Sequence, residues 1–298
     1  DEIVEGMPTS RKYSFKTGVS VMFGCNNFCS YCIVPYVRGR EKSREPQAII
    51  REIEELVADG VTEIMLLGQN VNSYGKTLET PVTFAELLKE VEKIEGLKRI
   101  RFMTSHPKDL SDELIQTMAE SQKICHHLHL PLQSGSSRVL KEMNRRYDKE
   151  KYLELVDKIR KAIPDISLTT DIMVGFPGET EEDMEILLNY LSRRKFYHLH
   201  VFPYSKRQGT VAAELADQVP EQVKKERVRK VIELGAQTAE DVYNSFANTV
   251  RQVLAERPSG REGFLTGTAD NFLTVEFPGR VSDIGKIMPI EIRRHNEF

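Results

Sequence analysis

Short, fully apolar runs alternate with amphipathic stretches from residue 19 to about residue 205. Such alternation is typical of parallel β-strands that are covered by α-helices. We expect six strands, each short and rich in β-branched or large apolar residues, over residues 19–23, 63–67, 99–103, 127–130, 167–174 and 198–202. Because no G-x-G-x-x-G motif follows the first strand, an open dinucleotide-binding sheet is disfavoured. The pattern therefore predicts an α/β fold, a partial (β/α)6 barrel of the TIM type.

Amphipathic stretches between these strands predict the helices. The clearest covers residues 46–59, where Ile49, Ile53 and Leu56 recur at helical spacing and Gly60 supplies the stop. Further helices are expected to follow Pro81, Ser111, Asp148 and Thr180. We assign residues 13–215 to the barrel and residues 1–12 to a linker that follows a missing N-terminal domain.

The pattern changes after Pro220. A charged run with an apolar side predicts a connecting helix, assigned to residues 216–247, whose basic stretch from Lys224 to Lys230 is expected to be exposed. From residue 248 to residue 298, alternating stretches divided by turns predict a small antiparallel β-barrel, with strands over residues 250–254, 263–268, 272–277 and 287–292. In the third of these strands Leu273, Val275 and Phe277 are expected to fill the barrel, leaving Phe272 free to stack on a base.

Composition places the chain among ordinary globular proteins. The 298 residues are 40% hydrophobic and 29% charged, and the net charge is -3, so any nucleic-acid partner must be held by local basic patches. No apolar run approaches the roughly 20 residues of a membrane helix. The chain begins with Asp1 rather than Met, and we expect it to be a fragment of a longer, cytoplasmic and monomeric protein without a membrane partner.

Three of the four cysteines, Cys25, Cys29 and Cys32, form C-x3-C-x2-C on a loop that leaves the first strand. Their thiolates could hold an iron-sulfur cluster or a zinc ion. Three ligands are one too few for a four-iron cluster, which would leave one iron open to a ligand from outside the protein. The alternative is a zinc site that one of four histidines completes: His106, His126, His127 or His129.

The stretch of residues 24–32, with an aromatic residue before its last cysteine, resembles the signature of radical S-adenosylmethionine (SAM) enzymes. Six further stretches resemble the methylthiotransferase family within that superfamily: residues 66–74, 104–107, 129–136, 143–147, 174–180 and 202–210. Residues 68–74 and 104–107 are most similar to the members that act on isopentenylated adenosine next to the tRNA anticodon. The C-terminal barrel is similar to the TRAM domain, a tRNA-binding module of the family.

This resemblance implies a transferase with a [4Fe-4S] cluster on Cys25, Cys29 and Cys32 and with S-adenosylmethionine as its second cofactor. It implies that cofactor cleavage yields a 5'-deoxyadenosyl radical, which removes hydrogen from C2 of N6-isopentenyladenosine before a methylthio group is attached there. A second [4Fe-4S] cluster is expected only on the missing N-terminal domain. The expected partners are the anticodon stem-loop of tRNA and an electron donor such as flavodoxin or ferredoxin.

Three alternatives stay open at this point. Within the family, the substrate could be threonylcarbamoyl-adenosine in tRNA or an aspartate of a ribosomal protein. Outside the enzyme class, the chain could be a tRNA-binding fragment whose metal site serves only structure.

The site residues follow from the strand ends and from the resemblance. For the cofactor, Gly68, Gln69 and Asn70 are expected at its amino group, and Ser105, Gln133 and Ser134 at its ribose or carboxylate. Tyr31, Gly175 and Phe202 are expected at its adenine, and Arg145 at its carboxylate. For the substrate, we expect Asp171 at the base if it points into the barrel. Arg38 and Arg40 are expected at phosphates, in a basic rim that continues to Lys42 and Arg44.

Overall fold

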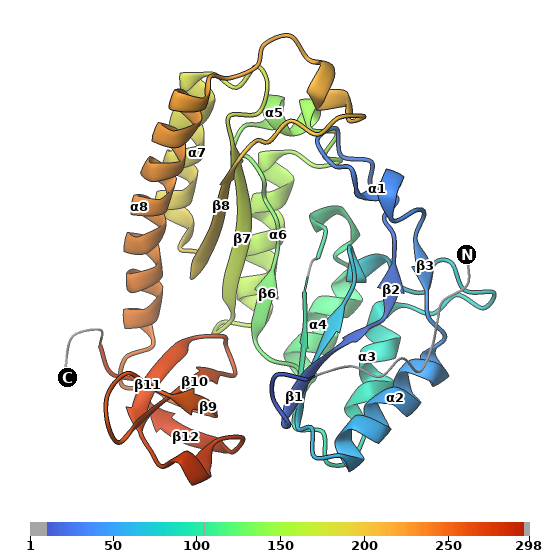
Figure 1. Ribbon diagram of the computed structural model, residues 1–298, viewed down its shortest axis with the longest axis vertical. Coiled ribbons are helices and arrows are strands. Elements are labelled where there is room, and N and C mark those ends of the chain that lie inside the picture. Colours follow the sequence, from blue (N-terminus) through green and yellow to red (C-terminus); the bar gives the residue numbers. More distant parts are fainter. Residues whose placement is uncertain (1–10, 104, 295–298) are drawn as a thin grey trace.

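A computed structural model describes residues 11–103 and 105–294 (Figure 1). Residues 1–10 of the expected linker, Thr104 of the motif at 104–107, and residues 295–298 lie outside the described residues. The barrel is built from two three-stranded parallel sheets. One has the order β1 (Lys16–Ser20), β4 (Glu63–Leu67), β5 (Arg99–Phe102), and the other the order β6 (His127–His129), β7 (Ser167–Val174), β8 (His198–Pro203).

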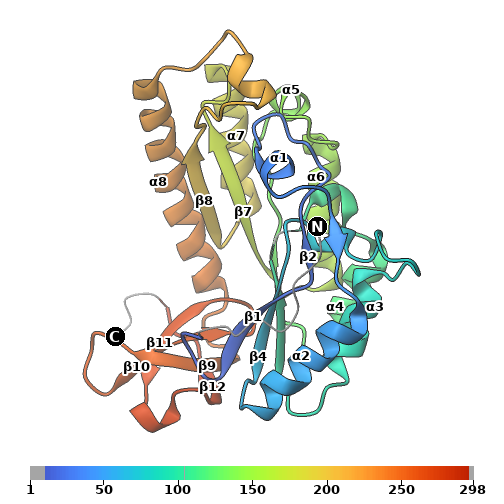
Figure 2. The ribbon, with the colours of Figure 1, turned by 45° about the vertical axis from the view of Figure 1, so that its right-hand side comes forward.

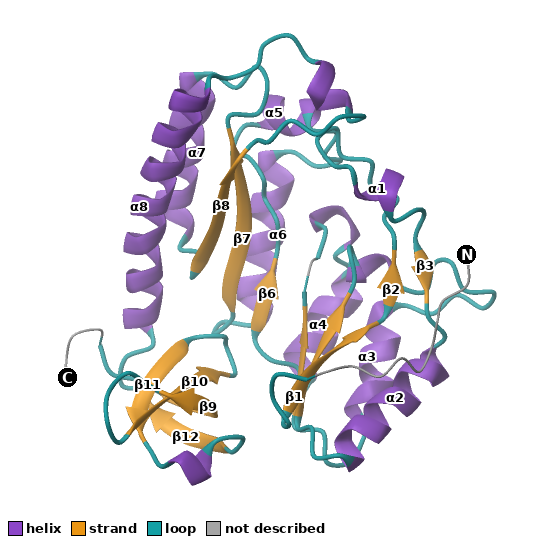
Figure 3. Ribbon diagram, in the orientation of Figure 1, coloured by secondary structure: helices purple, strands orange, loops and turns teal. Residues whose placement is uncertain are grey.

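The two sheets meet where Ile100 forms a parallel bridge with Ile124. Among the described residues β1 and β8 do not pair, so the barrel stays open along one side. Figure 3 shows the strands with the helices packed outside them. The α/β class and the six parallel strands are therefore confirmed, as a partial barrel made of two half-sheets.

The first strand is displaced from its expected position. We expected residues 19–23, but β1 covers Lys16–Ser20 and pairs in register with β4, Lys16 opposite Glu63. Met22–Phe23 forms a separate short strand, β2, which pairs antiparallel with β3, Lys42–Ser43. Pairing with a distant strand overrode the local apolar signal, as sheet context commonly does.

The helices begin where the sequence predicts. Four of them start next to a capping side chain: Thr83 before α3 (Phe84–Glu92), Ser111 before α4 (Asp112–Glu120), Asp148 before α6 (Lys149–Ala162) and Thr180 before α7 (Glu181–Arg194). Helix α2 (Pro46–Ala58) ends ahead of Gly60, whose φ of +93° suits glycine. The sequence analysis did not predict two short helices, α1 (Val34–Val37) and α5 (Ser137–Glu142), nor the 3-10 turns η1 (Val71–Ser73), η2 (Pro107–Asp109), η3 (Val211–Glu214) and η4 (Val281–Asp283).

The connecting helix α8 (Glu221–Ser245) packs against β8 and α7 (Figure 2). Our expectation of an exposed basic face is wrong for Lys224 and Arg227, which are both buried. Lys224 donates to the Tyr204 carbonyl, and Arg227 pairs with Glu179 and Glu181. Among the described residues no helix combines the length and apolar character that crossing a membrane requires.

The C-terminal part is a curled antiparallel sheet of four strands, in the order β11 (Thr274–Pro278), β10 (Phe264–Ala269), β9 (Val250–Pro258), β12 (Ile287–Glu291). Within the described residues β11 and β12 do not pair, so the sheet is a half-barrel rather than the closed barrel that we expected. Leu273, Val275 and Phe277 are buried in its core, as predicted.

The end of strand β10 and the turn that follows it close the amino-terminal end of the large barrel. Arg99 and Arg101 of β5 point to it and donate to the carbonyls of Thr268 and Ala269, at 3.0 and 2.7 Å. The Phe272 ring stacks on His127 of β6, with 3.9 Å between ring centres and 10° between planes. Phe272 is therefore not free to stack on a base, contrary to our expectation, because one of its faces is covered inside the protein.

Candidate active site

The cysteine loop, residues 24–33, runs from β2 to α1 at the carboxyl end of the barrel strands (Figure 1). Three backbone hydrogen bonds fix it: Cys25 N to the Gly39 carbonyl at 3.2 Å, Ser30 N to the Met143 carbonyl at 3.1 Å, and Ala212 N to the Ser30 carbonyl at 2.8 Å. Gly24 has a φ of +70°, and any side chain there would overlap the Arg40 carbonyl. The loop is therefore held by segments distant from it in sequence.

The three thiols repel one another when ionised. Cys25 and Cys29 are buried and Cys32 is half-buried. Burial raises the pKa of Cys25, and the charges of Cys29 and Cys32 raise it further. Burial likewise raises the pKa of Cys32, again with a contribution from Cys29. Three thiolates gathered in this way call for a positively charged centre among them.

A single metal ion does not suit this arrangement. Among the described residues no three His, Cys, Asp or Glu side chains converge closely enough to hold one ion. His126, one of the candidate zinc ligands, instead pairs with Asp165 at 2.7 Å. In a four-iron cluster each thiolate ligates a different iron atom, so the sulfur atoms need not meet at one point. The donor set therefore fits a cluster better than it fits zinc.

Arg145 lies against the cysteine loop. Its buried guanidinium donates from Nη1 to Cys29 Sγ at 3.3 Å, from Nη2 to the Pro131 carbonyl at 3.1 Å and from Nε to Tyr147 Oη at 2.9 Å. We expected this fork to bind the cofactor carboxylate, which stays a prediction. The structure adds a contact with a cluster cysteine, for which the sequence carries no signal.

Among the buried side-chain atoms of the described residues that have no protein partner, two belong to residues predicted for the cofactor. These are Ser105 Oγ, after β5, and Gln133 Oε1, after β6. Gln133 also has a φ of +70°, a strained backbone that two hydrogen bonds with β7 maintain. Ser134, beside it, accepts a bond from Ser136 N at 3.2 Å. Because buried polar atoms are normally satisfied, Ser105 and Gln133 fit an incoming polar ligand.

The predicted trio after β4 divides into different roles. Asn70 is fully buried. Its Nδ2 donates to Asp109 Oδ2 at 2.8 Å, and its Oδ1 accepts from His106 N at 3.1 Å. These two bonds connect the loop after β4 to the loop after β5. Gly68 is pressed against the Met22 side chain, and Gln69 is exposed. Contact of Gly68 and Gln69 with a cofactor stays a prediction, whereas the Asn70 amide already has protein partners.

An apolar layer lines the barrel mouth. Tyr31 and Phe202 pack on a cluster of buried residues that includes Met173, Phe176 and Tyr204. Two of the residues predicted for the adenine, one of them in the cysteine loop, therefore pack on the same apolar cluster. A flat apolar ligand is the kind of group that such a layer accommodates.

Gly175 was also predicted to lie at the cofactor adenine, but the structure gives another reason for a glycine at this position. Its φ is +72°, and a side chain at this position would overlap the aliphatic stem of Lys224 in α8. The glycine therefore admits a helix rather than a ligand on that side. Its N–H donates to Glu179 Oε1 at 2.7 Å.

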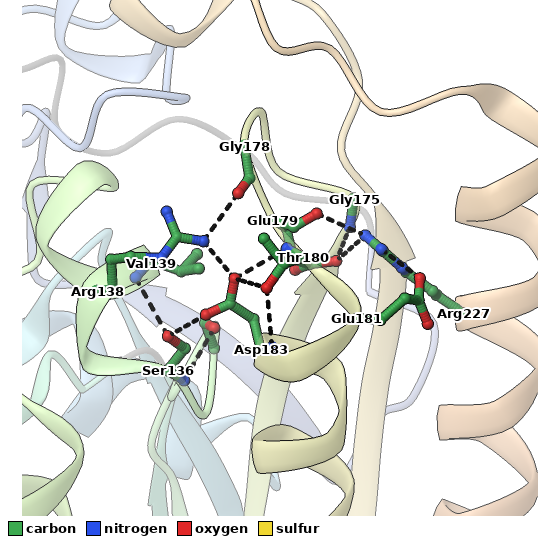
Figure 4. Close-up of polar contacts among 11 residues, drawn as sticks. Ser136, Arg138, Val139, Gly175, Gly178, Glu179, Thr180, Glu181, Asp183 and Arg227 are labelled. Atoms are coloured by element: carbon green, nitrogen blue, oxygen red, sulfur yellow. Dashed lines mark hydrogen bonds and ion pairs between the residues drawn. The ribbon is translucent and has the colours of Figure 1, made fainter.

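Glu179 belongs to a polar network that clamps the loop after β7 (Figure 4). It pairs with Arg227 at 2.8 Å, and Arg227 also reaches Glu181 at 2.6 Å. Burial raises the pKa of Glu179 to about 7, although the bond from Gly175 and the Arg227 charge oppose this shift. On the other side of the loop, Asp183 accepts from Ser136 Oγ at 2.6 Å. The network joins α8, α7 and the loop after β6.

The basic rim is only partly present. Arg38 and Arg40 are exposed beside the cysteine loop, and the Arg40 guanidinium lies 4.8 Å from the centre of the Phe28 ring. Arg44 is buried, donates to the Ser20 carbonyl at 2.6 Å and pairs with Glu52 at 2.7 Å. Arg44 therefore does not belong to a phosphate-binding rim, contrary to our expectation.

Asp171 points into the barrel, which the sequence left undecided. Its Oδ1 lies 3.3 Å from His129 Nε2, across the lumen side of β6 and β7. In the β-ladder it stands opposite His200 of β8. Two His-Leu-His triplets, at residues 127–129 and 198–200, place four histidines on the lumen face, and their period of two is the signal that the sequence analysis missed.

Comparison with known proteins gives a consistent result. A family model described as the radical SAM superfamily matches residues 19–191. Three similar relatives are each called tRNA-2-methylthio-N(6)-dimethylallyladenosine synthase. They come from Lachnoclostridium phytofermentans (53% identical), Clostridium tetani (51%) and Clostridium novyi (52%), with 100%, 100% and 99% of this chain covered. The chain spans 66% of the length of each of these relatives.

Solved structures share the fold at low identity. The coproporphyrinogen III oxidase HemN from Escherichia coli, a radical SAM enzyme, has a TM-score of 0.56 and 17% identity, over 76% of this chain and 54% of that one. The radical SAM methyltransferase TsrM from Kitasatospora setae, with cobalamin and a [4Fe-4S] cluster bound, has a TM-score of 0.55 and 18% identity, over 66% and 38% of the two chains.

Proposed function

This chain belongs to the radical SAM superfamily, and from that premise we propose that it is the catalytic part of a tRNA methylthiotransferase. The proposed reaction places a methylthio group at C2 of an N6-isopentenyladenosine next to the anticodon. The observation that carries the proposal is the similarity, at 50–53% identity over at least 99% of the chain, to relatives named for this modification. Dimethylallyl in those names is the same substituent as isopentenyl.

We propose that Cys25, Cys29 and Cys32 hold a [4Fe-4S] cluster and that the mouth above it takes S-adenosylmethionine. When bound and reduced, the cluster supplies the electron that splits the cofactor into methionine and a 5'-deoxyadenosyl radical. Ser105 Oγ and Gln133 Oε1, the two unpartnered atoms, bond its polar groups, and the layer of Tyr31 and Phe202 packs on its adenine. Arg145 holds Cys29 in place and offsets its charge.

The remaining parts follow from this function. The C-terminal half-barrel is a TRAM-like module that grips tRNA, and Arg38 and Arg40 contact the phosphates of the anticodon stem-loop. We propose that the sulfur comes from a second [4Fe-4S] cluster outside the residues of this chain, which spans 66% of the length of the relatives. Electrons come from a flavodoxin or ferredoxin, and the protein works as a monomer in the cytoplasm.

The test compares substrates under anaerobic conditions. The reconstituted full-length protein, with S-adenosylmethionine and a reductant, is given tRNA bearing isopentenyladenosine, tRNA bearing threonylcarbamoyl-adenosine, or the ribosomal-protein substrate. Mass spectrometry of the digested products should show the methylthio group on the first alone. Modification of either of the other two, or no 5'-deoxyadenosine with any of them, contradicts the proposal.

Two cysteine variants provide the matched control. Cys29→Ser removes a proposed cluster ligand and should abolish 5'-deoxyadenosine formation. Cys125→Ser alters a buried thiol that lies near Arg101 and Glu63, outside the cysteine loop, and should leave formation within about twofold. Equal activity of the two variants would reject the cluster assignment.

A further inference from the structure

A polar layer lies inside the barrel, beneath the apolar layer at its mouth. Asp171 of β7 and His200 of β8 stand opposite each other, one register step below Met173 and Phe202. Because strand residues two apart are separated by about 7 Å, this is the next layer down from Tyr31 and Phe202. His129 of β6 is paired with Thr169, one step further down, and its side chain reaches up to this layer: Nε2 lies 3.3 Å from Asp171 Oδ1, and the ring centre lies 5.4 Å from that of His200. We name Asp171, His129 and His200 the histidine shelf.

Two of the three shelf residues, Asp171 and His200, are open to solvent, whereas His129 is buried. The Asp171 side chain is 27% exposed, although β7 is flanked by strands on both sides. His200 is also exposed, on the lumen face of the unpaired edge strand β8. Both side chains therefore border an accessible space beside the barrel mouth. The exposed ring of His200 is held edge to face against His198, with 4.5 Å between the ring centres.

A chain of hydrogen bonds beneath the shelf orients His129 so that its Nε2 donates to the Asp171 carboxylate. Thr169 Oγ1 lies 3.0 Å from both His127 Nε2 and His129 Nδ1, but the hydroxyl has only one proton to donate. Burial lowers the pKa of His127 far below its usual value, so this ring is neutral. When His129 donates from Nε2 to Asp171, its Nδ1 accepts from Thr169, which in turn accepts from His127 Nε2.

This hydrogen-bond chain occupies one carboxylate oxygen of Asp171 and leaves the other available to accept a hydrogen bond from a ligand. Oδ1 is taken by His129, and among the described residues no other side chain donates to this carboxylate. No backbone N–H of the described residues donates to the Asp171 carboxylate either. The group thus presents a fixed hydrogen-bond acceptor to the lumen, beside the flat ring of His200.

We propose that the histidine shelf binds the base of the RNA substrate, with Asp171 accepting the single N–H left on N6 of a substituted adenine and His200 packing against the ring. This rests on the proposed function and adds the means of recognition. Thr169 and His127 are positioning residues, because they act only through His129. Burial lowers the pKa of His200, with smaller contributions from His198 and His129, which keeps the ring neutral for stacking.

The test measures RNA binding rather than turnover. Fluorescence anisotropy follows an anticodon stem-loop that carries N6-isopentenyladenosine, and a second stem-loop whose N6 bears two alkyl groups and no hydrogen. The full-length protein should bind the second about tenfold more weakly, as loss of one hydrogen bond to a charged group predicts. The Asp171→Asn variant should bind the first stem-loop about as weakly as the second. The reason is that the asparagine amide places an N–H donor opposite the N6–H donor of the base.

The control is Asp157→Asn, on the outer face of α6, where the carboxylate is exposed and pairs with Arg194. It should discriminate between the two stem-loops as the unaltered protein does. If Asp171→Asn retains the tenfold discrimination, the shelf does not read N6, while the proposed function stands. If the unaltered protein binds neither stem-loop, the proposed substrate itself is wrong.

Thr169 tests the positioning chain. Thr169→Val removes the hydroxyl and leaves Nδ1 of His129 without its donor, so the discrimination between the stem-loops should fall at least threefold. Thr169→Ser retains the hydroxyl and should restore it. A purely structural role predicts instead that both variants lose affinity for both stem-loops alike, which would overturn the role of the chain.

Discussion

At the scale of single residues, Arg145 connects the cysteine loop to the rest of the barrel mouth. Its three bonds run to a thiol, a tyrosine hydroxyl and a backbone carbonyl. The guanidinium carries its donors on three nitrogens in a rigid plane, so three separate atoms of Arg145 each reach one acceptor, whereas a lysine would have to use a single nitrogen. The bond to Cys29 also stabilises negative charge on that sulfur, and this charge increases when a cluster is reduced.

Arg145→Gln should therefore make the proposed cluster harder to reduce. Loss of the charged donor is expected to lower the midpoint potential by on the order of tens of millivolts. An EPR-monitored redox titration of the anaerobic protein measures this shift. Arg146→Gln, at the exposed neighbouring position, is the matched control and should leave the potential unchanged. An identical potential in Arg145→Gln and the unaltered protein would contradict the assigned contact.

The sequence predicts some of these residues and not others, for a physical reason. The cysteines are recognisable because their spacing and order lie within one loop. Asn70 bonds Asp109 and His106, which lie 39 and 36 residues away. The bond of Arg145 to Cys29 spans 116 residues, and that of Lys224 to the Tyr204 carbonyl spans 20. Only the folded chain brings these partners together, so their roles could not be read from local pattern.

At the scale of elements, helix α8 is fastened to the loop that follows β7. Lys224 fills the space left by Gly175, and Arg227 pairs with the buried Glu179. The side chains of Glu179 and Arg227 are only 2% and 5% exposed. A charge pair at such depth is stabilising only while both members are present.

Arg227→Met should destabilise the fold in a pH-dependent manner. At pH 8 it leaves a buried carboxylate with no guanidinium partner, at a cost of about 3 kcal/mol. The pKa of Glu179 is raised from 4.5 to about 7, so the protonated form is favoured in the folded state and stability falls as pH rises through this window. At pH 5 Glu179 is protonated, and the variant should lose much less.

Urea unfolding at the two pH values measures this difference. Arg229→Met is the control, because Arg229 is exposed on the same helix and pairs with the exposed Glu233 in the following turn. It should be near neutral at both pH values. A loss in Arg227→Met that is the same at pH 5 and pH 8 would show that the Glu179 charge is not its cause.

Element boundaries were predictable where the chain signals them locally. Ser111, Asp148 and Thr180 mark helix starts because each side chain caps its own first turn. The first strand was displaced because its register is set by β4, more than 40 residues away. The half-barrel form of the C-terminal sheet likewise depends on which strands pair. The alternation of apolar and polar residues predicts the strands but not their pairing.

At the scale of the whole molecule, the C-terminal sheet forms the floor of the catalytic barrel. A layer of charge lies there, with Glu63 at 3.1 Å from Arg101 and 3.5 Å from Arg99. Both arginines also donate to carbonyls of the C-terminal sheet. The C-terminal sheet, which we propose binds RNA, is thereby held in fixed register with the barrel. The stack of Phe272 on His127 continues into the hydrogen-bond chain beneath the histidine shelf.

Phe272→Ala should loosen this attachment. Loss of a half-buried stacked ring is expected to lower the free energy of unfolding by about 2 kcal/mol and to speed amide exchange in β6. Phe264→Ala is the control, since that ring lies over Arg261 and not against the barrel. Hydrogen exchange followed by mass spectrometry distinguishes the two variants. Unaltered exchange in β6 of Phe272→Ala would mean that the ring does not secure the floor.

The most direct measurement concerns the open corner of the cluster. The anaerobic protein is reduced, mixed with S-adenosylmethionine carrying a nitrogen-15 amino group, and studied by electron-nuclear double resonance. We predict a nitrogen hyperfine coupling that shows the amino group bound to iron, in the unaltered protein and in Cys125→Ser alike. A reduced cluster that shows no coupling to the labelled nitrogen, or a site that contains zinc without sulfide, would contradict the account.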